Sequence, residues 1–187
     1  MRQYRRAIEF HQQSLEISQE ISDRQGITNS LGNLGNAHYL LSQYQQAIDF
    51  YQQSLEVSQE IGDRNSEAIS FSSLGNAYNS LGQYQQAIDF SQQSLEIARE
   101  IGDRNVEAIS LGSLGSAYRS LGQYQHAIDF YQQQLEIAHE IGDRRGKASS
   151  QFHTGLALLK INQEEEARTA FKEARQLFAS QWTSLRW

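Results

Sequence analysis

Residues 44–83 read YQQAIDFYQQSLEVSQEIGDRNSEAISFSSLGNAYNSLGQ, and residues 84–123 read YQQAIDFSQQSLEIAREIGDRNVEAISLGSLGSAYRSLGQ. The second stretch is a near copy of the first, about three-quarters identical, at a period of about 40 residues. A weaker copy begins at Tyr4, and a more divergent copy begins at Tyr124. A unit this short cannot bury its apolar face alone, so it must stack on its neighbours. The repeats therefore predict one continuous stack.

Each unit has the pattern of two helices. Its apolar residues recur at three- and four-residue intervals, as on one face of an α-helix, and not at the two-residue interval of a strand. Gly62 and Asp63 mark a boundary, because glycine accepts the left-handed conformation that ends a helix and aspartate caps the next one. The predicted helices cover residues 3–21, 24–41, 44–61, 64–81, 84–101, 104–121, 124–141, 144–161 and 163–179.

The predicted connections are only two or three residues long. Successive helices must therefore form antiparallel hairpins, each with a first helix (A) and a second helix (B). This predicts an all-α chain in which residues 1–180 form one solenoid and residues 181–187 form a C-terminal tail. The solenoid divides into a half repeat at 1–22 and repeats at 23–62, 63–102, 103–142 and 143–180.

The units share an internal pattern, Phe71-x-x-Leu74-Gly75-x-x-Tyr78 followed by Ala87 and Ser91. The same positions hold Leu31, Leu34, Gly35, His38, Ala47 and Tyr51 in the first pair, Leu111, Leu114, Gly115, Tyr118, Ala127 and Tyr131 in the third, and the fourth keeps Gly155, Ala167, Phe171 and Ala174. This pattern resembles the tetratricopeptide (TPR) repeat signature, and the 40-residue units are similar to those of LGN/Pins-type adaptors and bacterial TPR arrays. HEAT repeats and WD40 blades share the period but lack the pattern. The resemblance implies a right-handed α-solenoid of about four and a half repeats.

Glycine in the middle of a helix also has a physical role in this pattern. Gly75 costs roughly 1 kcal/mol relative to alanine inside a helix, so a close contact must offset it. The small residues Gly75 and Ala87 are expected to let helices A and B of one unit approach closely.

The chain contains no proline, which suits uninterrupted helices, although the TPR signature has a proline at the end of its unit.

Composition excludes several classes of protein. The formal net charge of -6 argues against a nucleic-acid binder, and no apolar run approaches the roughly 20 residues that cross a bilayer. The start of the chain, MRQYRR, lacks the apolar segment of a secretory signal. We therefore expect a soluble, cytoplasmic protein without a nucleic-acid or membrane partner.

Residues with catalytic or metal-binding chemistry form no site in the sequence. The five histidines have no metal-ligand spacing: His11 and His38 replace tyrosines of other units, as partly packed rings, while His126 and His139 are expected to be solvated. The carboxylates recur with the repeat, which indicates a solvated helix face, and Glu164, Glu165 and Glu166 suit a helix start. We expect no enzyme, no cofactor and no metal.

The resemblance implies that the A helices line a concave groove. Helical spacing places there a candidate peptide-binding set, composed of Asn29, Asn36, Tyr39, Asn65, Asn76, Asn79, Asn105, Ser116, Arg119, Arg145, Phe152 and Lys160. Asparagine amides can both donate to and accept from a peptide backbone. The cationic members favour an acidic or carboxyl-terminated ligand, and Phe152 could receive an apolar anchor. The carboxylate clamp of chaperone-binding TPRs is not supported, because Gly32 and Ser72 stand where its lysine is expected.

Two functions remain open from the sequence. The first is a protein-interaction scaffold that binds an extended or helical peptide of a partner in the groove; a merely soluble inner face is the alternative for that stripe. The second is a structural spacer or self-assembling module, because the half repeat at 1–22 lacks a helix A and could pair with another copy as a homodimer. A longer array, of which this half repeat would be a part, is the other explanation for the missing helix A. The tail, with Trp182 and Trp187, could fold back or insert into another molecule.

Overall fold

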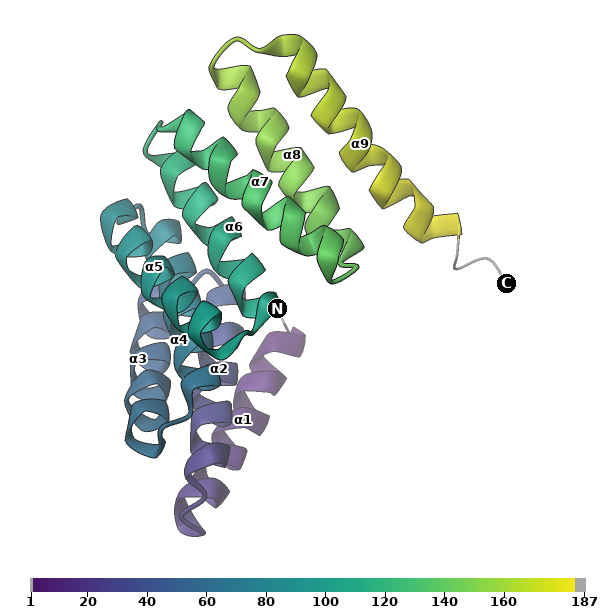
Figure 1. The fold of residues 1–187 in the computed structure, drawn as a ribbon. Coiled ribbons are helices and arrows are strands. Elements are labelled where there is room, and N and C mark those ends of the chain that lie inside the picture. The colour runs from purple at the N-terminus through teal and green to yellow at the C-terminus, as the bar shows by residue number, and fades with distance from the viewer. Residues whose placement is uncertain (1, 184–187) are drawn as a thin grey trace. The chain divides into compact units, whose positions relative to one another are not determined.

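In a computed structural model, the described backbone comprises residues 2–183 and the described side chains comprise residues 3–179. All elements in this part of the chain are helices (Figure 1). They are α1 (Arg2–Glu20), α2 (Arg24–Leu40), α3 (Tyr44–Ile61), α4 (Arg64–Ser80), α5 (Tyr84–Ile101), α6 (Arg104–Ser120), α7 (Tyr124–Glu140), α8 (Arg144–Lys160) and α9 (Glu164–Thr183). The predicted boundaries agree to within one residue, except that α9 continues to Thr183 beyond the predicted end at residue 179. The prediction for the tryptophan side chains of the tail lies outside the described residues.

The helices belong to two compact units that divide after Asp103. In the first unit, α2 packs on α3 and α4 packs on α5, while α1 packs on α2. The A helices α2 and α4 also contact each other. In the second unit, α6 packs on α7 and α8 packs on α9, and the A helices α6 and α8 touch. The predicted helical hairpins are thus confirmed in both units.

The predicted cap is present at the Gly62-Asp63 boundary, whereas the Asp143 side chain makes no capping hydrogen bond at the start of α8. The Asp63 carboxylate accepts a hydrogen bond from the backbone N–H of Ser66 at 3.1 Å, and Gly62 has a φ of 70°, in the left-handed region. The same conformation occurs without glycine at Ser22 and Ser42, whose positions in the repeat correspond to Gly62 and Gly82. The turn geometry is therefore set by the repeat as a whole, even where the residue is not the preferred one.

Close approach of helices A and B is confirmed within the hairpins. A Cβ on Gly35 would lie 2.4 Å from Cε1 of Tyr51, and a Cβ on Gly115 would lie 2.6 Å from Cε1 of Tyr131. At Gly75 the same atom would lie 2.4 Å from the Ser91 hydroxyl. Each glycine thus makes room for a side chain of the following B helix.

Ion pairs hold the starts of the α4–α5 and α6–α7 hairpins. Arg64 pairs with both Glu67 and Glu100, and Arg104 pairs with the equivalent Glu107 and Glu140. Exposed pairs of this kind contribute little stability individually. Because Glu67 and Glu107 are buried, however, these two carboxylates require their arginine partners.

One face of α1 is uncovered, as predicted. Phe10 and Ile17 of α1 are 66% and 58% exposed, and Ile21, directly after the helix, is 68% exposed. In α5, the residue equivalent to Ile17 is Ile97, which is only 6% exposed. The difference arises because α5 has an A helix of its own hairpin and α1 does not. Among the described residues, no helix has the length and apolar character needed to cross a bilayer.

Candidate functional site

The strongest candidate site is a pocket of about 310 Å³ between α2 and α4 in the first unit. Its lining comprises Thr28, Asn29, Gly32, Asn33 and Asn36 from α2, Tyr51 and Ser54 from α3, and Ser66, Ile69, Ser70 and Ser73 from α4. Helical spacing predicted Asn29 and Asn36 as groove residues, and the structure brings both to this one pocket. We call it the α2–α4 pocket.

The floor of the α2–α4 pocket is a fixed hydrogen-bonded layer. The Tyr51 hydroxyl donates to Oδ1 of Asn36 at 2.7 Å, and burial raises the pKa of Tyr51 far above its usual range. The Ser54 hydroxyl donates to the backbone carbonyl of Thr28 at 3.1 Å, and the Ser70 hydroxyl donates to Ser54 at 3.2 Å. The floor is therefore uncharged throughout the physiological pH range.

The mouth of the pocket offers hydrogen bonds without charge. None of its described lining residues is ionised at neutral pH. The carboxamides of Asn29, Asn33 and Asn36 are exposed, and each can donate and accept. Ile69 adds an exposed apolar side chain at the same edge. This combination suits a peptide backbone or an uncharged polar side chain.

In the second unit a side chain fills the equivalent place. Gln134 of α7 occupies the repeat position that Ser54 has in α3. A Cβ added to Gly112 would lie 2.6 Å from Nε2 of Gln134. A Cβ added to the equivalent Gly32 would have the Ser54 hydroxyl as its nearest neighbour, at 3.8 Å. The Ser150 hydroxyl, equivalent to that of Ser70, donates to Oε1 of Gln134 at 2.9 Å.

The other predicted residues of the first unit lie outside the pocket lining. Tyr39 is linked through its hydroxyl to the hydroxyl of Ser80 at 3.0 Å. Asn65 donates from Nδ2 to the Asp103 carboxylate at 2.8 Å, which ties the start of α4 to the loop after α5. Asn76 and Asn79 are half-buried on α4.

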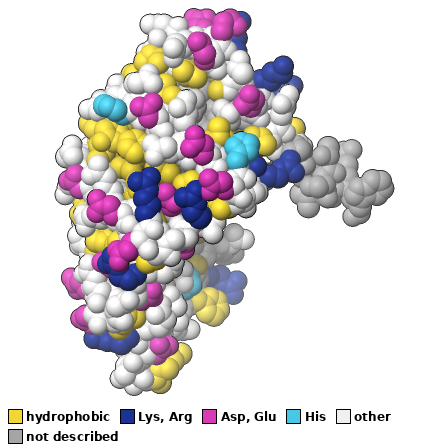
Figure 2. Space-filling model, viewed as in Figure 1, with side chains coloured by type: hydrophobic (Ala, Val, Ile, Leu, Met, Phe, Trp, Pro, Cys, Tyr) yellow, Lys and Arg dark blue, Asp and Glu magenta, His cyan; other side chains and the backbone are white. Residues whose placement is uncertain are grey.

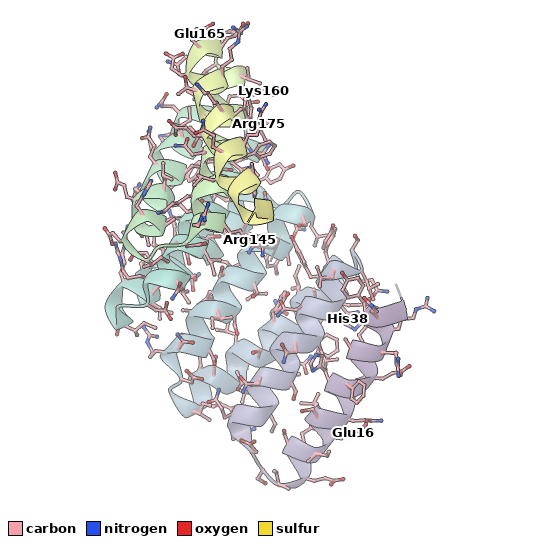
Figure 3. The ribbon with its side chains drawn as sticks, turned by 90° about the vertical axis from the view of Figure 1, so that its right-hand side faces the viewer. Glu16, His38, Arg145, Lys160, Glu165 and Arg175 are labelled. Atoms are coloured by element: carbon pink, nitrogen blue, oxygen red, sulfur yellow. The ribbon has the colours of Figure 1, made fainter. Side chains whose placement is uncertain are left out.

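The predicted residues of the second unit are spread along α6 and α8. Asn105, Arg145 and Lys160 are exposed, and Ser116 and Arg119 are half-buried. Figure 3 shows Arg145 and Lys160 at opposite ends of α8, which corresponds to about 22 Å along a helix axis. One carboxylate therefore cannot contact both of them. Phe152 is exposed, but its ring packs against that of Phe171, with the two ring centroids 5.7 Å apart.

Several residues of the site were not predicted. Asn33 and Ser73 line the pocket and occupy equivalent positions in successive repeats. The same position holds Ser113 in the third repeat and His153 in the fourth. Ser54 belongs to a position that changes to glutamine at residue 134. The signal for these residues is the difference between otherwise near-identical repeats, but the predicted set covers only one stripe of the A helices.

His153 is a half-buried histidine in the second unit. Its ring stacks on Tyr131 with centroids 5.5 Å apart, and burial, followed by the positive charge of Arg119, lowers the pKa of the His153 imidazole. Above pH ~6.5 the imidazole is neutral in both the folded and unfolded states. As the pH falls below that value, the imidazole binds a proton more readily in the unfolded chain than in the folded chain, so the free energy of unfolding decreases.

Replacing His153 by serine, as at Ser113, is therefore expected to reduce the loss of stability on acidification. The measurement is the free energy of unfolding in urea at pH 7.5 and pH 5.5 for both proteins. His139→Gln is the control, because it removes an exposed histidine of the same unit. An identical pH dependence in wild type and His153→Ser would contradict the assignment.

Charged side chains outside the pocket are mixed in sign. On the face drawn in Figure 2, acidic and basic side chains are interspersed among uncharged ones. No group of three or more histidine, cysteine, aspartate or glutamate side chains within the described residues is placed to hold a metal ion.

Comparisons with known proteins agree with this architecture. A family model described as "Tetratricopeptide repeat" matches residues 1–60, 66–138 and 106–180. No curated protein sequence matches the chain.

Solved structures resemble the chain at low sequence identity. BtubC from P. vanneervenii is 18% identical with a TM-score of 0.83, over 96% of this chain and 74% of that one. Aspartyl phosphate phosphatase F from Bacillus subtilis is 17% identical with a TM-score of 0.84, over 96% of this chain and 46% of that one. The STAND protein PH0952 from Pyrococcus horikoshii, which has a tetratricopeptide repeat sensor, is 19% identical with a TM-score of 0.77, over 98% of this chain and 29% of that one. At these identities the likeness concerns the fold.

Proposed function

Because this chain belongs to the tetratricopeptide repeat family, we propose that it is a protein-interaction module that binds an extended peptide segment of a partner along its A helices. The observation that carries the proposal is the α2–α4 pocket, where three exposed asparagine carboxamides surround an uncharged, hydrogen-bonded floor. A pocket of this kind offers partners to the N–H and C=O groups of an extended backbone, which has no internal hydrogen bonds of its own.

Charge in the partner is a second part of the proposal. Arg119, Arg145 and Lys160 would favour an acidic side chain or a terminal carboxylate in the ligand. Arg145 and Lys160 are too far apart to act as one clamp, so each would contribute a separate and salt-sensitive contact. The neutral pocket would supply most of the directional hydrogen bonding.

Selection of peptides from a displayed random library tests the proposal. Binding of an enriched peptide is expected to weaken about tenfold or more in the double variant Asn29→Ala, Asn36→Ala, because two hydrogen-bonding groups are lost at about 0.5–1.5 kcal/mol each. The matched control is Gln52→Ala, Gln92→Ala, which removes two exposed amides from the B helices α3 and α5.

A second control separates binding from folding. Tyr51→Phe removes the same internal hydrogen bond that Asn36→Ala removes, but it leaves the asparagine amide in place. It should therefore bind the peptide nearly as well as wild type. If no peptide is enriched, or if the Gln52, Gln92 control weakens binding equally, this pocket is not a peptide site.

The alternative, a self-assembling spacer, is favoured by the uncovered face of α1. Side chains as exposed as Phe10, Ile17 and Ile21 could bury apolar surface against another copy. Static light scattering as a function of concentration distinguishes the two functions. A mass that rises with concentration and falls back in Ile17→Glu supports association through α1, and a constant monomer mass opposes it.

A further inference from the structure

The second unit shows which chemical group fits the place that is open in the first unit. Three positions correspond: Gly112 to Gly32, Ser150 to Ser70, and Gln134 to Ser54. In the second unit, the Gln134 carboxamide lies over Gly112 and accepts from the hydroxyl of Ser150. In the first unit, the same glycine and serine line the α2–α4 pocket.

The reason for the difference is the length of one side chain. Ser54 is short, so its hydroxyl stays in the floor, where it donates to the carbonyl of Thr28. The volume that the Gln134 side chain fills in the second unit is therefore empty in the first unit, where it opens between the A helices. In the second unit, glycine leaves room for this side chain, because Nε2 of Gln134 lies 2.6 Å from where a Cβ on Gly112 would be.

We propose that the α2–α4 pocket takes the side-chain carboxamide of a glutamine or asparagine in the bound peptide, which lies as the carboxamide of Gln134 lies in the second unit. The inference rests on the proposed peptide-binding function and names the side chain that the pocket recognises. The carboxamide oxygen would accept from Ser70, whose hydroxyl would turn to the ligand from its present acceptor, Ser54. The NH₂ group would lie over Gly32, within reach of the asparagine side chains at the mouth.

Other side chains fit this pocket less well. A carboxylate would be placed among lining residues that carry no compensating positive charge, which is unfavourable in a partly desolvated site. An apolar side chain of the same length would displace water from the asparagine amides at the mouth without offering them a hydrogen bond. A carboxamide satisfies both donors and acceptors and brings no charge.

The test uses three small probes that differ only in the end of the side chain: the N-acetyl, N-methylamide derivatives of glutamine, glutamate and methionine. Each is titrated into ¹⁵N-labelled full-length protein, and the backbone amide resonances are followed by NMR. The glutamine probe is expected to give saturable shifts centred on Gly32, Ser70 and Ser73. The glutamate and methionine probes should bind at least about tenfold more weakly, because each lacks part of the hydrogen bonding.

Two variants are designed to fill the pocket in the first unit and to open the equivalent pocket in the second. Ser54→Gln should fill the pocket from below and reduce binding of the glutamine probe at least about tenfold. It is expected to fold, because the chain already accommodates glutamine beneath glycine at Gln134 and Gly112. Gln134→Ser should open the second unit and produce new saturable shifts at Gly112 and Ser150. Gln133→Ser, on the neighbouring residue, is the control and should do neither.

The outcomes separate this inference from the proposed function. Equal binding of the three probes, or unchanged binding of the glutamine probe to Ser54→Gln, would overturn the carboxamide inference. If peptides from the displayed library still bound through Asn29 and Asn36, the peptide-binding function would stand without it. Binding of the glutamine probe without any enriched peptide would instead remove the function and keep the pocket chemistry.

Discussion

Replacing Leu114 by alanine is expected to lower the free energy of unfolding by about 2–5 kcal/mol. Leu114 is 0% exposed and lies in the middle of α6, so the deleted atoms leave a cavity as well as lost apolar burial. The neighbouring Leu111 and Ala117 are also fully buried, and they restrict how far the site can collapse. Denaturation in guanidinium chloride, followed by helical circular dichroism, measures the change.

The control for this prediction is Leu121→Ala. Leu121 follows the last turn of α6 but is 40% exposed, so its truncation should cost much less. A loss in Leu114→Ala no larger than that of the control would show that the centre of the hairpin is not packed as described.

Replacing Gly115 by leucine is expected to destabilise the protein by about 1–3 kcal/mol through overpacking. The new Cβ would lie 2.6 Å from the ring of Tyr131, and that ring is only 1% exposed, so it has little room to move. The better helix propensity of leucine, worth up to roughly 1 kcal/mol, offsets only part of this cost. The measurement is the same denaturation experiment.

A double variant tests the mechanism of this effect. The Tyr131 ring is the group that the new Cβ would meet, because its Cε1, Cδ1 and Cζ atoms would lie 2.6, 2.7 and 3.0 Å away. Tyr131→Ala removes this ring and should therefore make room for the leucine, so that the cost of Gly115→Leu is smaller in that background than in wild type. Additive effects of the two substitutions, or a melting temperature of Gly115→Leu equal to that of wild type, would contradict the packing assignment.

The agreement between prediction and structure is best where the determinants are local. The Gly62-Asp63 boundary places a left-handed residue and a cap next to each other, so one dipeptide specifies both the end of α3 and the start of α4. Gly35, Gly75 and Gly115 recur at a period that no helix propensity explains, so close packing was the remaining physical reason for them. The structure confirms both features.

The lining of the α2–α4 pocket was predicted less completely. Asn29 and Asn36 were found because they share one face of a single helix, and helical spacing is readable from sequence. Asn65 lies on the same stripe, but its amide reaches a carboxylate 38 residues away, and no local pattern reports such a partner. Arg145 and Lys160 were grouped by charge, although the length of α8 keeps them apart.

The sequence by itself determined the helices, their hairpin order and the glycines that let the hairpins close, because each depends on spacing within about 40 residues and recurs in every repeat. Only the tertiary structure decided which repeat has an open pocket. That outcome depends on the reach of one side chain from a B helix, Ser54 or Gln134, into the space between two A helices of successive repeats. A one-dimensional pattern shows that these residues differ, but the volume that the difference opens or fills exists only when three helices are packed together.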